Sequence, residues 1–187
     1  MSASKPQRIG IWIIAVVMVI GTIASFAVIV LANENTRTDQ KTQQQTLEDY
    51  KKQMKEQSEK NAAVSKPLEG YSAEAFDSAS VTELKVDTLI QGDGKAAEAS
   101  STVTANYFGW TYDGKIFDST NKEGTTTPID FSLTGVIEGW TKGLAGVKAG
   151  STVKLWIPEA MAYGPTAAEN GQPAGPLVFI VELKEVK

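Results

Sequence analysis

A run of 24 residues without a single charge, Ile9 to Ala32, constrains this chain more than any other feature. About 20 apolar residues in a helix span the hydrocarbon core of a bilayer. A buried helix of a soluble protein is the alternative, but the run has no polar face at any helical period. We therefore predict a transmembrane helix over residues 9–32.

The charges that flank this run predict its orientation. Lys5 and Arg8 precede it, whereas the charges just after it cancel. The basic bias predicts a cytoplasmic tail over residues 1–8 and places everything after Ala32 outside a cytoplasmic membrane that is crossed once. The apolar region of a cleaved signal peptide is shorter, about 7 to 15 residues, which favours an uncleaved signal-anchor. The small residues near Ala32 still resemble a cleavage site, and cleavage there would give a secreted protein.

The chain contains neither cysteine nor histidine. This composition excludes disulfides, a cysteine nucleophile, zinc sites of the cysteine type and a Ser-His-Asp triad. It also removes histidine-ligated metals and the commonest general base, so an enzyme of this composition is expected to need little proton transfer. From Val64 onward there are 10 lysines, no arginine and 16 acidic residues, a net charge of −6. A nucleic acid is therefore not the expected partner.

Residues 33–66 are polar and rich in Gln, Lys and Glu, with no glycine or proline. Leu47, Tyr50 and Met54 recur at helical spacing, but the stripe lasts barely two turns, and a sustained coiled coil needs three or four heptads. We predict a solvated, partly helical stalk, which would reach roughly 45 Å if some 30 residues were helical. A dimerising coil remains the alternative, although we expect a monomer.

Residues 67–187 have the texture of a folded domain, with its core over 81–187. Strand patterns occur at 80–90, 128–133, 149–158 and 177–186, and residues 101–120 form a predicted hairpin that turns at Asp113-Gly114. Between them, "GVIEGWTKGL" (135–144) predicts one short helix, and residues 159–176 form a loop dense in glycine and proline. The fold class is therefore α+β: a curved antiparallel sheet of about five strands wrapped around one helix, with the helix of Trp140 as the only good cover for the sheet.

The order of motifs in this domain resembles the FKBP-type peptidyl-prolyl cis-trans isomerases. "GDG" (92–94) is followed by "ANYFGWTYDGKIFDST", "VIEGWTKGLAGVKAGSTVKLWIP", "AYG" (162–164) and "PLVFIVEL". The resemblance covers about 105 residues and leaves the anchor and the stalk out.

The resemblance implies a shallow apolar site in which the edge of Trp140 is packed and its indole face is left open to hold a proline ring. It implies that the Ile137 N–H and the Tyr163 hydroxyl meet substrate carbonyls, and that Asp118 polarises the wall beside Tyr107. The catalytic residues it implies are Tyr107, Asp118, Ile137 and Tyr163, and the substrate-binding residues are Phe117, Ile129, Phe131, Val136, Trp140, Ala162 and Phe179. Without it, the inward-facing Phe131, Val136 and Phe179 are ordinary core residues, Tyr107 and Tyr163 edge residues, and Asp118 a turn or cap residue.

Two segments depart from the pattern of the family. Gln172 stands where many members carry a bulky aliphatic residue, so inhibitor sensitivity and the preferred residue before proline stay open. The segment "NKEGTTTP" (121–128) has no arginine, so the usual basic neighbour of Asp118 is either missing or replaced by Lys122. We expect Trp156, between the inward Leu155 and Ile157, to face outward as a surface or partner contact.

The function that the resemblance implies is isomerisation of X–Pro bonds in exported proteins, that is, a membrane-tethered rotamase that assists protein folding. The partners would be proline-containing polypeptides, with macrolides as inhibitors. Rotation of an X–Pro bond would require no metal or cofactor. The alternatives are a proline-binding or chaperone module with little turnover and an interaction domain with a decayed site. The expected pocket residues are intact, which argues against a decayed site.

Overall fold

The computed structural model describes residues 37–187. The predicted transmembrane helix (9–32) and cytoplasmic tail (1–8) lie outside the described residues. Within the described part of the chain, no helix is long and apolar enough to cross a membrane.

The predicted stalk region forms one long helix, α2 (Arg37–Val64). Its sequence is rich in Gln, Lys and Glu, which are good helix formers, and it has no glycine or proline. The helix ends just before Pro67, because the residue that precedes a proline is disfavoured in the helical conformation. Leu47 and Tyr50 are exposed, whereas Met54 is half-buried. The roles of α2 as a stalk or a dimerising coil stay predictions.

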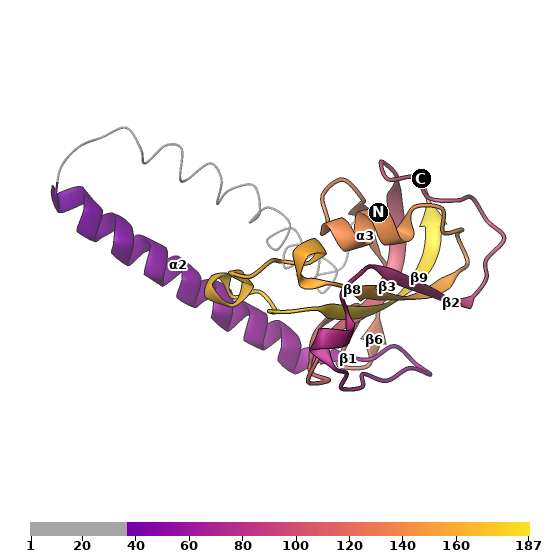
Figure 1. Cartoon of the computed structure of the whole chain (residues 1–187), viewed down its shortest axis with the longest axis horizontal. Coiled ribbons are helices and arrows are strands. Elements are labelled where there is room, and N and C mark those ends of the chain that lie inside the picture. Colours follow the sequence, from indigo (N-terminus) through magenta and orange to yellow (C-terminus); the bar gives the residue numbers. More distant parts are fainter. Residues whose placement is uncertain (1–36) are drawn as a thin grey trace, which may run out of the picture. The chain divides into compact units, whose positions relative to one another are not determined.

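The domain is built on a six-stranded antiparallel sheet (Figure 1). Its strands are β2 (Lys85–Ile90), β3 (Thr102–Thr111), β4 (Ile116–Ser119), β7 (Ile129–Ser132), β8 (Thr152–Ile157) and β9 (Leu177–Val186). The order is β2-β8-β9-β3-β4, and β7 also pairs with β3. Strand β3 is central: β9 pairs along one edge from Val103 to Thr111, while β7 and β4 share the other edge. The predicted strand segments and the α+β fold class are confirmed.

The hairpin between β3 and β4 follows the predicted Asp-Gly turn. Gly114 adopts a φ of 78°, and its N–H donates to the carbonyl of Thr111 over 2.8 Å. Residues with a side chain rarely adopt this positive φ, which is why glycine is favoured at position 114.

The short helix α3 (Glu138–Leu144) covers one face of the sheet. It approaches β8 closely because two of its inward positions are glycines. A Cβ built on Gly139 would lie 2.3 Å from Cγ2 of Ile157, and one on Gly143 would lie 3.0 Å from Cδ2 of Leu155. The remaining inward positions, Trp140 and Leu144, are buried against the sheet.

The expectation that α3 is the only cover for the sheet is wrong. Phe108, Trp110, Val178 and Ile180 are buried on the face opposite α3's, together with Leu68, and Tyr71, Ala73, Phe76 and Trp156 pack on them. The indole N–H of Trp110 donates to the carbonyl of Glu74 over 2.9 Å. The irregular segment after Pro67 therefore closes this second face, because consecutive strand residues point to opposite sides and both sides of β3 are apolar.

A small second sheet joins the end of α2 to the chain beyond β4. It consists of β1 (Ser65–Lys66), β5 (Asn121–Lys122) and β6 (Thr125–Thr126), in the order β1-β5-β6. Three short 3-10 helices complete the described chain: η2 (Ser78–Ser80), η3 (Glu159–Met161) and η4 (Ala167–Asn170). The last two lie in the predicted glycine- and proline-rich loop.

Candidate active site

Four aromatic rings from four different elements meet over the α3 face of the sheet. Tyr107 of β3 contacts Trp140 of α3 edge-to-face at a centroid distance of 5.3 Å, and Phe131 of β7 at 5.4 Å. Trp140 also contacts Phe131 at 5.2 Å and Phe179 of β9 at 5.5 Å. Edge-to-face pairs of this kind add about 0.5–1.5 kcal/mol beyond the burial of area. The indole is thus held on several sides.

A fifth ring, Phe117 of β4, extends this group through an edge-to-face contact with Phe179 at 5.5 Å. Both rings lie directly over Gly109 of β3. A Cβ built there would be 2.5 Å from Cε1 of Phe179 and 2.7 Å from Cζ of Phe117. Glycine in the middle of a strand makes this close approach possible. We call these five residues the aromatic site: Tyr107, Phe117, Phe131, Trp140 and Phe179.

The open indole face expected for Trp140 is not observed. Only 4% of the residue is exposed, and Phe131 and Phe179 are similarly covered. The reason is the edge-to-face packing, which surrounds the indole with three other rings. The accessible part of the site is supplied by half-buried residues such as Phe117, Ile137 and Tyr163.

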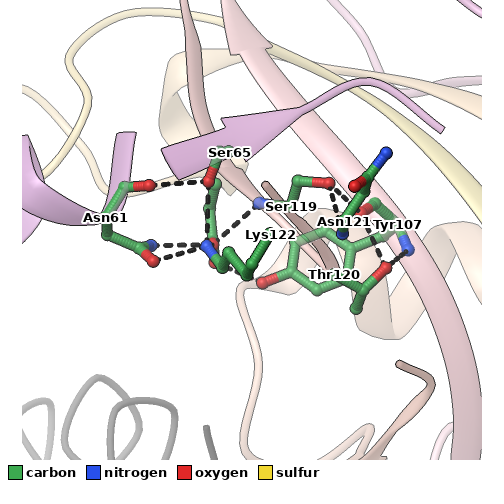
Figure 2. A network of polar contacts seen from close by, with 8 residues as sticks. Asn61, Ser65, Tyr107, Ser119, Thr120, Asn121 and Lys122 are labelled. Atoms are coloured by element: carbon green, nitrogen blue, oxygen red, sulfur yellow. Dashed lines mark hydrogen bonds and ion pairs between the residues drawn. The ribbon is translucent and has the colours of Figure 1, made fainter. Parts of the chain in front are cut away.

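Asp118 lies beside the aromatic site and binds Tyr107 directly. The phenol hydroxyl of Tyr107 donates to Oδ2 of Asp118. The backbone of Tyr107 is fixed as well, because its N–H donates to Oγ1 of Thr120 over 2.9 Å and its carbonyl accepts from Thr120 N–H over 2.8 Å. Figure 2 shows Ser119 and Thr120 beside Tyr107, with their hydrogen bonds to its backbone as dashed lines.

Lys122 is the basic neighbour of Asp118 in the segment 121–128, which has no arginine. Its Nζ lies 2.8 Å from Oδ1 of Asp118, and the two side chains are 32% and 20% exposed. Oδ1 also accepts from the backbone N–H of Ser119 over 2.8 Å. The hypothesis that Lys122 stands in as the basic neighbour is confirmed.

Both tyrosines of the site keep their hydroxyl protons at neutral pH. Burial, and then the negative charge of Asp118, raise the pKa of Tyr107 well above its usual range. The same two causes raise the pKa of Tyr163 above its usual range. Protonated phenols donate hydrogen bonds, so Tyr163 is a potential donor to a substrate carbonyl.

Ile137 offers a second donor at the start of α3. It is the N-cap residue, and its carbonyl accepts from the N–H of Trp140 over 2.9 Å. Its own N–H makes no hydrogen bond within residues 37–187. Donors left free at a helix start can bind an acceptor such as a carbonyl oxygen.

The structure brings most of the predicted residues together. Tyr107, Phe117, Phe131, Trp140 and Phe179 are in ring contact, and Asp118 is bonded to Tyr107. Ile129, Val136, Ala162 and Tyr163 are half-buried on the segments next to them in the chain. Their roles toward a substrate stay predictions.

Sequence reasoning missed Gly109, although a glycine inside a strand is a recognised signal of close packing. It also missed Asn61 of α2, whose side-chain nitrogen donates to Oδ1 of Asp118 over 2.7 Å. Asn61 lies 57 residues before Asp118 in a largely polar helix. It follows Met54 by seven residues, but its polar side chain adds no apolar signal to the short stripe of Leu47, Tyr50 and Met54.

Trp156 points away from the aromatic site, as predicted, but contacts residues of this chain. Its indole N–H donates to Oδ2 of Asp87 over 2.9 Å, and its ring packs edge-to-face on Phe76 at 5.5 Å. The ammonium of Lys154 lies 4.3 Å from the ring centroid. A hollow of about 270 Å³ lies beside it, lined by Ser80 to Glu83 and Lys85. This hollow is not part of the aromatic site.

The described residues contain no group of three or more acidic side chains that could hold a metal ion. The candidate active site combines the apolar rings of the aromatic site with two neutral donors, the Tyr163 hydroxyl and the Ile137 N–H, and with the carboxylate of Asp118, which is fixed by Lys122. Such a site can bind an apolar ring and a carbonyl group, and it can exclude water from them.

Comparisons with known proteins agree with this architecture. The family model described as FKBP-type peptidyl-prolyl cis-trans isomerase matches residues 93–184. The chain is 36% identical to the FKBP-type peptidyl-prolyl cis-trans isomerase FkpA of Escherichia coli K12 over 165 residues, 83% of this chain and 60% of the relative. It is 40% identical to the outer membrane protein MIP of Legionella longbeachae over 107 residues, 56% of this chain and 44% of MIP.

Solved structures extend the match. The crystal structure of FkpA from Escherichia coli aligns with a TM-score of 0.51 at 31% identity, covering 100% of this chain and 84% of that one. A peptidyl-prolyl cis-trans isomerase from Pseudomonas syringae aligns with a TM-score of 0.50 at 30% identity, covering 73% and 95%. The chain belongs to the FKBP-type peptidyl-prolyl cis-trans isomerase family. Its sequence match spans 60% of the length of FkpA.

Proposed function

We propose that this chain catalyses cis-trans isomerisation of X–Pro bonds in polypeptides at the aromatic site. The observation that carries the proposal is that Tyr107 both donates a hydrogen bond to Asp118 and packs edge-to-face on Trp140. Membership of the family supports the same activity.

The chemistry of the reaction suits such a site. Rotation about a peptide bond has a barrier of about 18–20 kcal/mol, because resonance makes the C–N bond partly double. The planar ground state carries more charge separation than the twisted transition state. An apolar, water-poor environment therefore destabilises the ground state more, and each 1.4 kcal/mol gained is worth about tenfold in rate.

We assign a separate role in the reaction to each group of residues in the site. The half-buried Phe117, Ile137 and Tyr163 receive the proline, and the buried rings of Trp140 and Phe179 close the site behind it and exclude water. The Ile137 N–H and the Tyr163 hydroxyl donate to substrate carbonyls and hold the flanking peptide while the bond rotates. Asp118 holds Tyr107 against the indole. No proton has to move to or from the protein, which suits a chain without histidine or cysteine.

The test is acceleration of cis-trans exchange in a short X–Pro peptide by the full chain in detergent. We expect Asp118→Ala and Tyr163→Phe to lower kcat/KM by about 10-fold each, the order of magnitude of one lost hydrogen bond to a charged or reacting group. Tyr112→Phe is the matched control, because Tyr112 is 49% exposed at the β3–β4 turn. A folded wild-type chain that binds the peptide but does not accelerate exchange would instead be a proline-binding module.

We further propose that residues 9–32 anchor the protein in the cytoplasmic membrane, with α2 as a stalk and the domain outside. The uncharged run and the basic residues before it support this topology. The test is membrane fractionation with protease access to the domain, combined with the mass of the mature N-terminus. A chain that starts near residue 33 and is found in the medium would contradict the anchor and favour secretion.

A further inference from the structure

The end of helix α2 reaches the carboxylate of the candidate active site. Asn61 donates from Nδ2 to Oδ1 of Asp118 over 2.7 Å, and its Oδ1 accepts from Nζ of Lys122. One amide thus bridges a carboxylate and an ammonium, with its donor on the anion and its acceptor on the cation. A flipped amide would point its N–H groups at the ammonium and its oxygen at the carboxylate, so both charges favour the observed orientation.

Lys122 has each of its donors matched to an acceptor. An ammonium carries three N–H groups, and Nζ donates to Oδ1 of Asp118 over 2.8 Å, to Oγ of Ser65 over 2.8 Å and to Oδ1 of Asn61. The hydroxyl of Ser65 donates in turn to the carbonyl of Asn61 over 2.7 Å. Because Ser65 Oγ uses its proton on that carbonyl, its lone pairs remain available to accept from the ammonium. Figure 2 shows Ser65 between Asn61 and Lys122.

The backbone fixes the same junction. β1 pairs with β5 so that Ser65 lies opposite Lys122. The N–H of Glu123 donates to the carbonyl of Val64 over 2.9 Å, and the side-chain amide of Asn121 donates to the carbonyl of Pro67 over 2.7 Å. The cation that neutralises Asp118 is therefore held by the segment that leaves α2.

The result is a carboxylate with a single defined orientation. Its Oδ1 accepts from three donors, the Ser119 N–H, Lys122 and Asn61, and its Oδ2 is left for the hydroxyl of Tyr107. Charge-assisted hydrogen bonds of this kind are roughly twice as strong as neutral ones. Removal of one donor leaves the carboxylate less fixed and Tyr107 less firmly held against Trp140.

A second contact brings α2 against the loop that follows Tyr163. Gly171 has a φ of 71°, and a Cβ there would lie 2.9 Å from the backbone nitrogen of Lys55 and 3.1 Å from the carbonyl carbon of Met54. The helix therefore approaches two segments of the domain, the one that carries Asp118 and the loop that follows Tyr163.

We propose that Asn61 and Ser65 are positioning residues of the active site, supplied by a segment outside the family match at residues 93–184. They hold Lys122 and Asp118 so that Tyr107 stays in its catalytic position. The inference rests on the proposed isomerase function.

The test is a double-mutant cycle in the full chain, read as kcat/KM for an X–Pro peptide. We expect Asn61→Leu to lower kcat/KM by about 5-fold in the wild-type background and by less than about 1.5-fold in the Asp118→Ala background, because it acts through Asp118. Asn61→Asp should be at least as damaging, since it cannot donate to Asp118 and sets two carboxylates side by side. Lys60→Leu, at an exposed neighbouring position of α2, is the control and should change nothing.

The outcomes separate this inference from the proposed function. An equal fall in both backgrounds, or no fall in the wild-type background, overturns the positioning role. If the wild-type chain binds the peptide without turnover, the proposed function fails and the same cycle is read from the Kd of the peptide. Coupling between Asn61 and Asp118 in the Kd then supports positioning, and additivity overturns it. A folded wild-type chain that neither binds nor turns over the peptide overturns both.

Discussion

Replacement of Gly109 by alanine is the most informative single change in the aromatic site. The new methyl group would lie 2.5 Å from Cε1 of Phe179 and 2.7 Å from Cζ of Phe117. Ordinary carbon–carbon contacts are about 3.5–4.0 Å, so both rings have to move by about 1 Å. Overpacking of this kind costs about 1–3 kcal/mol of unfolding free energy. For a domain of this size, that corresponds to a fall in Tm of about 4 to 12 °C.

The same displacement has a functional consequence. Misplacement by about 1 Å can cost as much as 100-fold in rate, and we expect Gly109→Ala to lower kcat/KM by about 10-fold at a temperature where it is fully folded. The assay combines thermal unfolding with peptide isomerisation. Gly135→Ala is the control, because its Cβ would lie 3.6 Å from the carbonyl oxygen of Ser132, an ordinary contact. Unchanged Tm and activity in Gly109→Ala would refute the packing described for Phe117 and Phe179.

Two further predictions concern polar groups. Tyr107→Phe removes the donor to Oδ2 of Asp118 and should lower the unfolding free energy by about 1–3 kcal/mol, measured by urea titration. For Glu182, burial raises the pKa, but hydrogen bonds from Lys184 and Asn106 outweigh it and leave the pKa below its usual range. The ionised Glu182 therefore contributes fully to the free energy of unfolding above its usual pKa of about 4.3. This contribution is lost as the pH falls through the lower pKa that Glu182 has in the folded chain. Glu182→Gln should flatten this part of the stability–pH curve, and an unaltered acid limb would contradict the assignment.

The strands and the short helix were predictable because their signals are local. The hairpin of β3 and β4 follows from alternation and an Asp-Gly turn, and α3 follows from the helical spacing of Ile137, Trp140 and Leu144. The aromatic residues of the site were placed by resemblance to the family, which transfers a long-range arrangement that periodicity alone does not contain.

The remaining features depend on contacts between distant segments. The segment after Pro67 covers the second face of the sheet with Tyr71 and Phe76, two isolated aromatics without any period. Asn61 is a polar residue in a largely polar helix, so nothing in the sequence distinguishes it from the solvated residues around it. The closed indole of Trp140 follows from ring packing in three dimensions. A single sequence states which residues are apolar or polar, but not which distant segment they meet.

The central claim is that the aromatic site lowers the barrier to X–Pro rotation. The most direct measurement is NMR exchange spectroscopy of a short X–Pro peptide at equilibrium, with the full chain added at a small fraction of the peptide concentration. The account predicts exchange cross-peaks between the cis and trans signals at an unchanged cis:trans ratio, and their loss with Trp140→Ala. A folded wild-type chain that produces no exchange faster than uncatalysed isomerisation, which takes tens to hundreds of seconds, would contradict it.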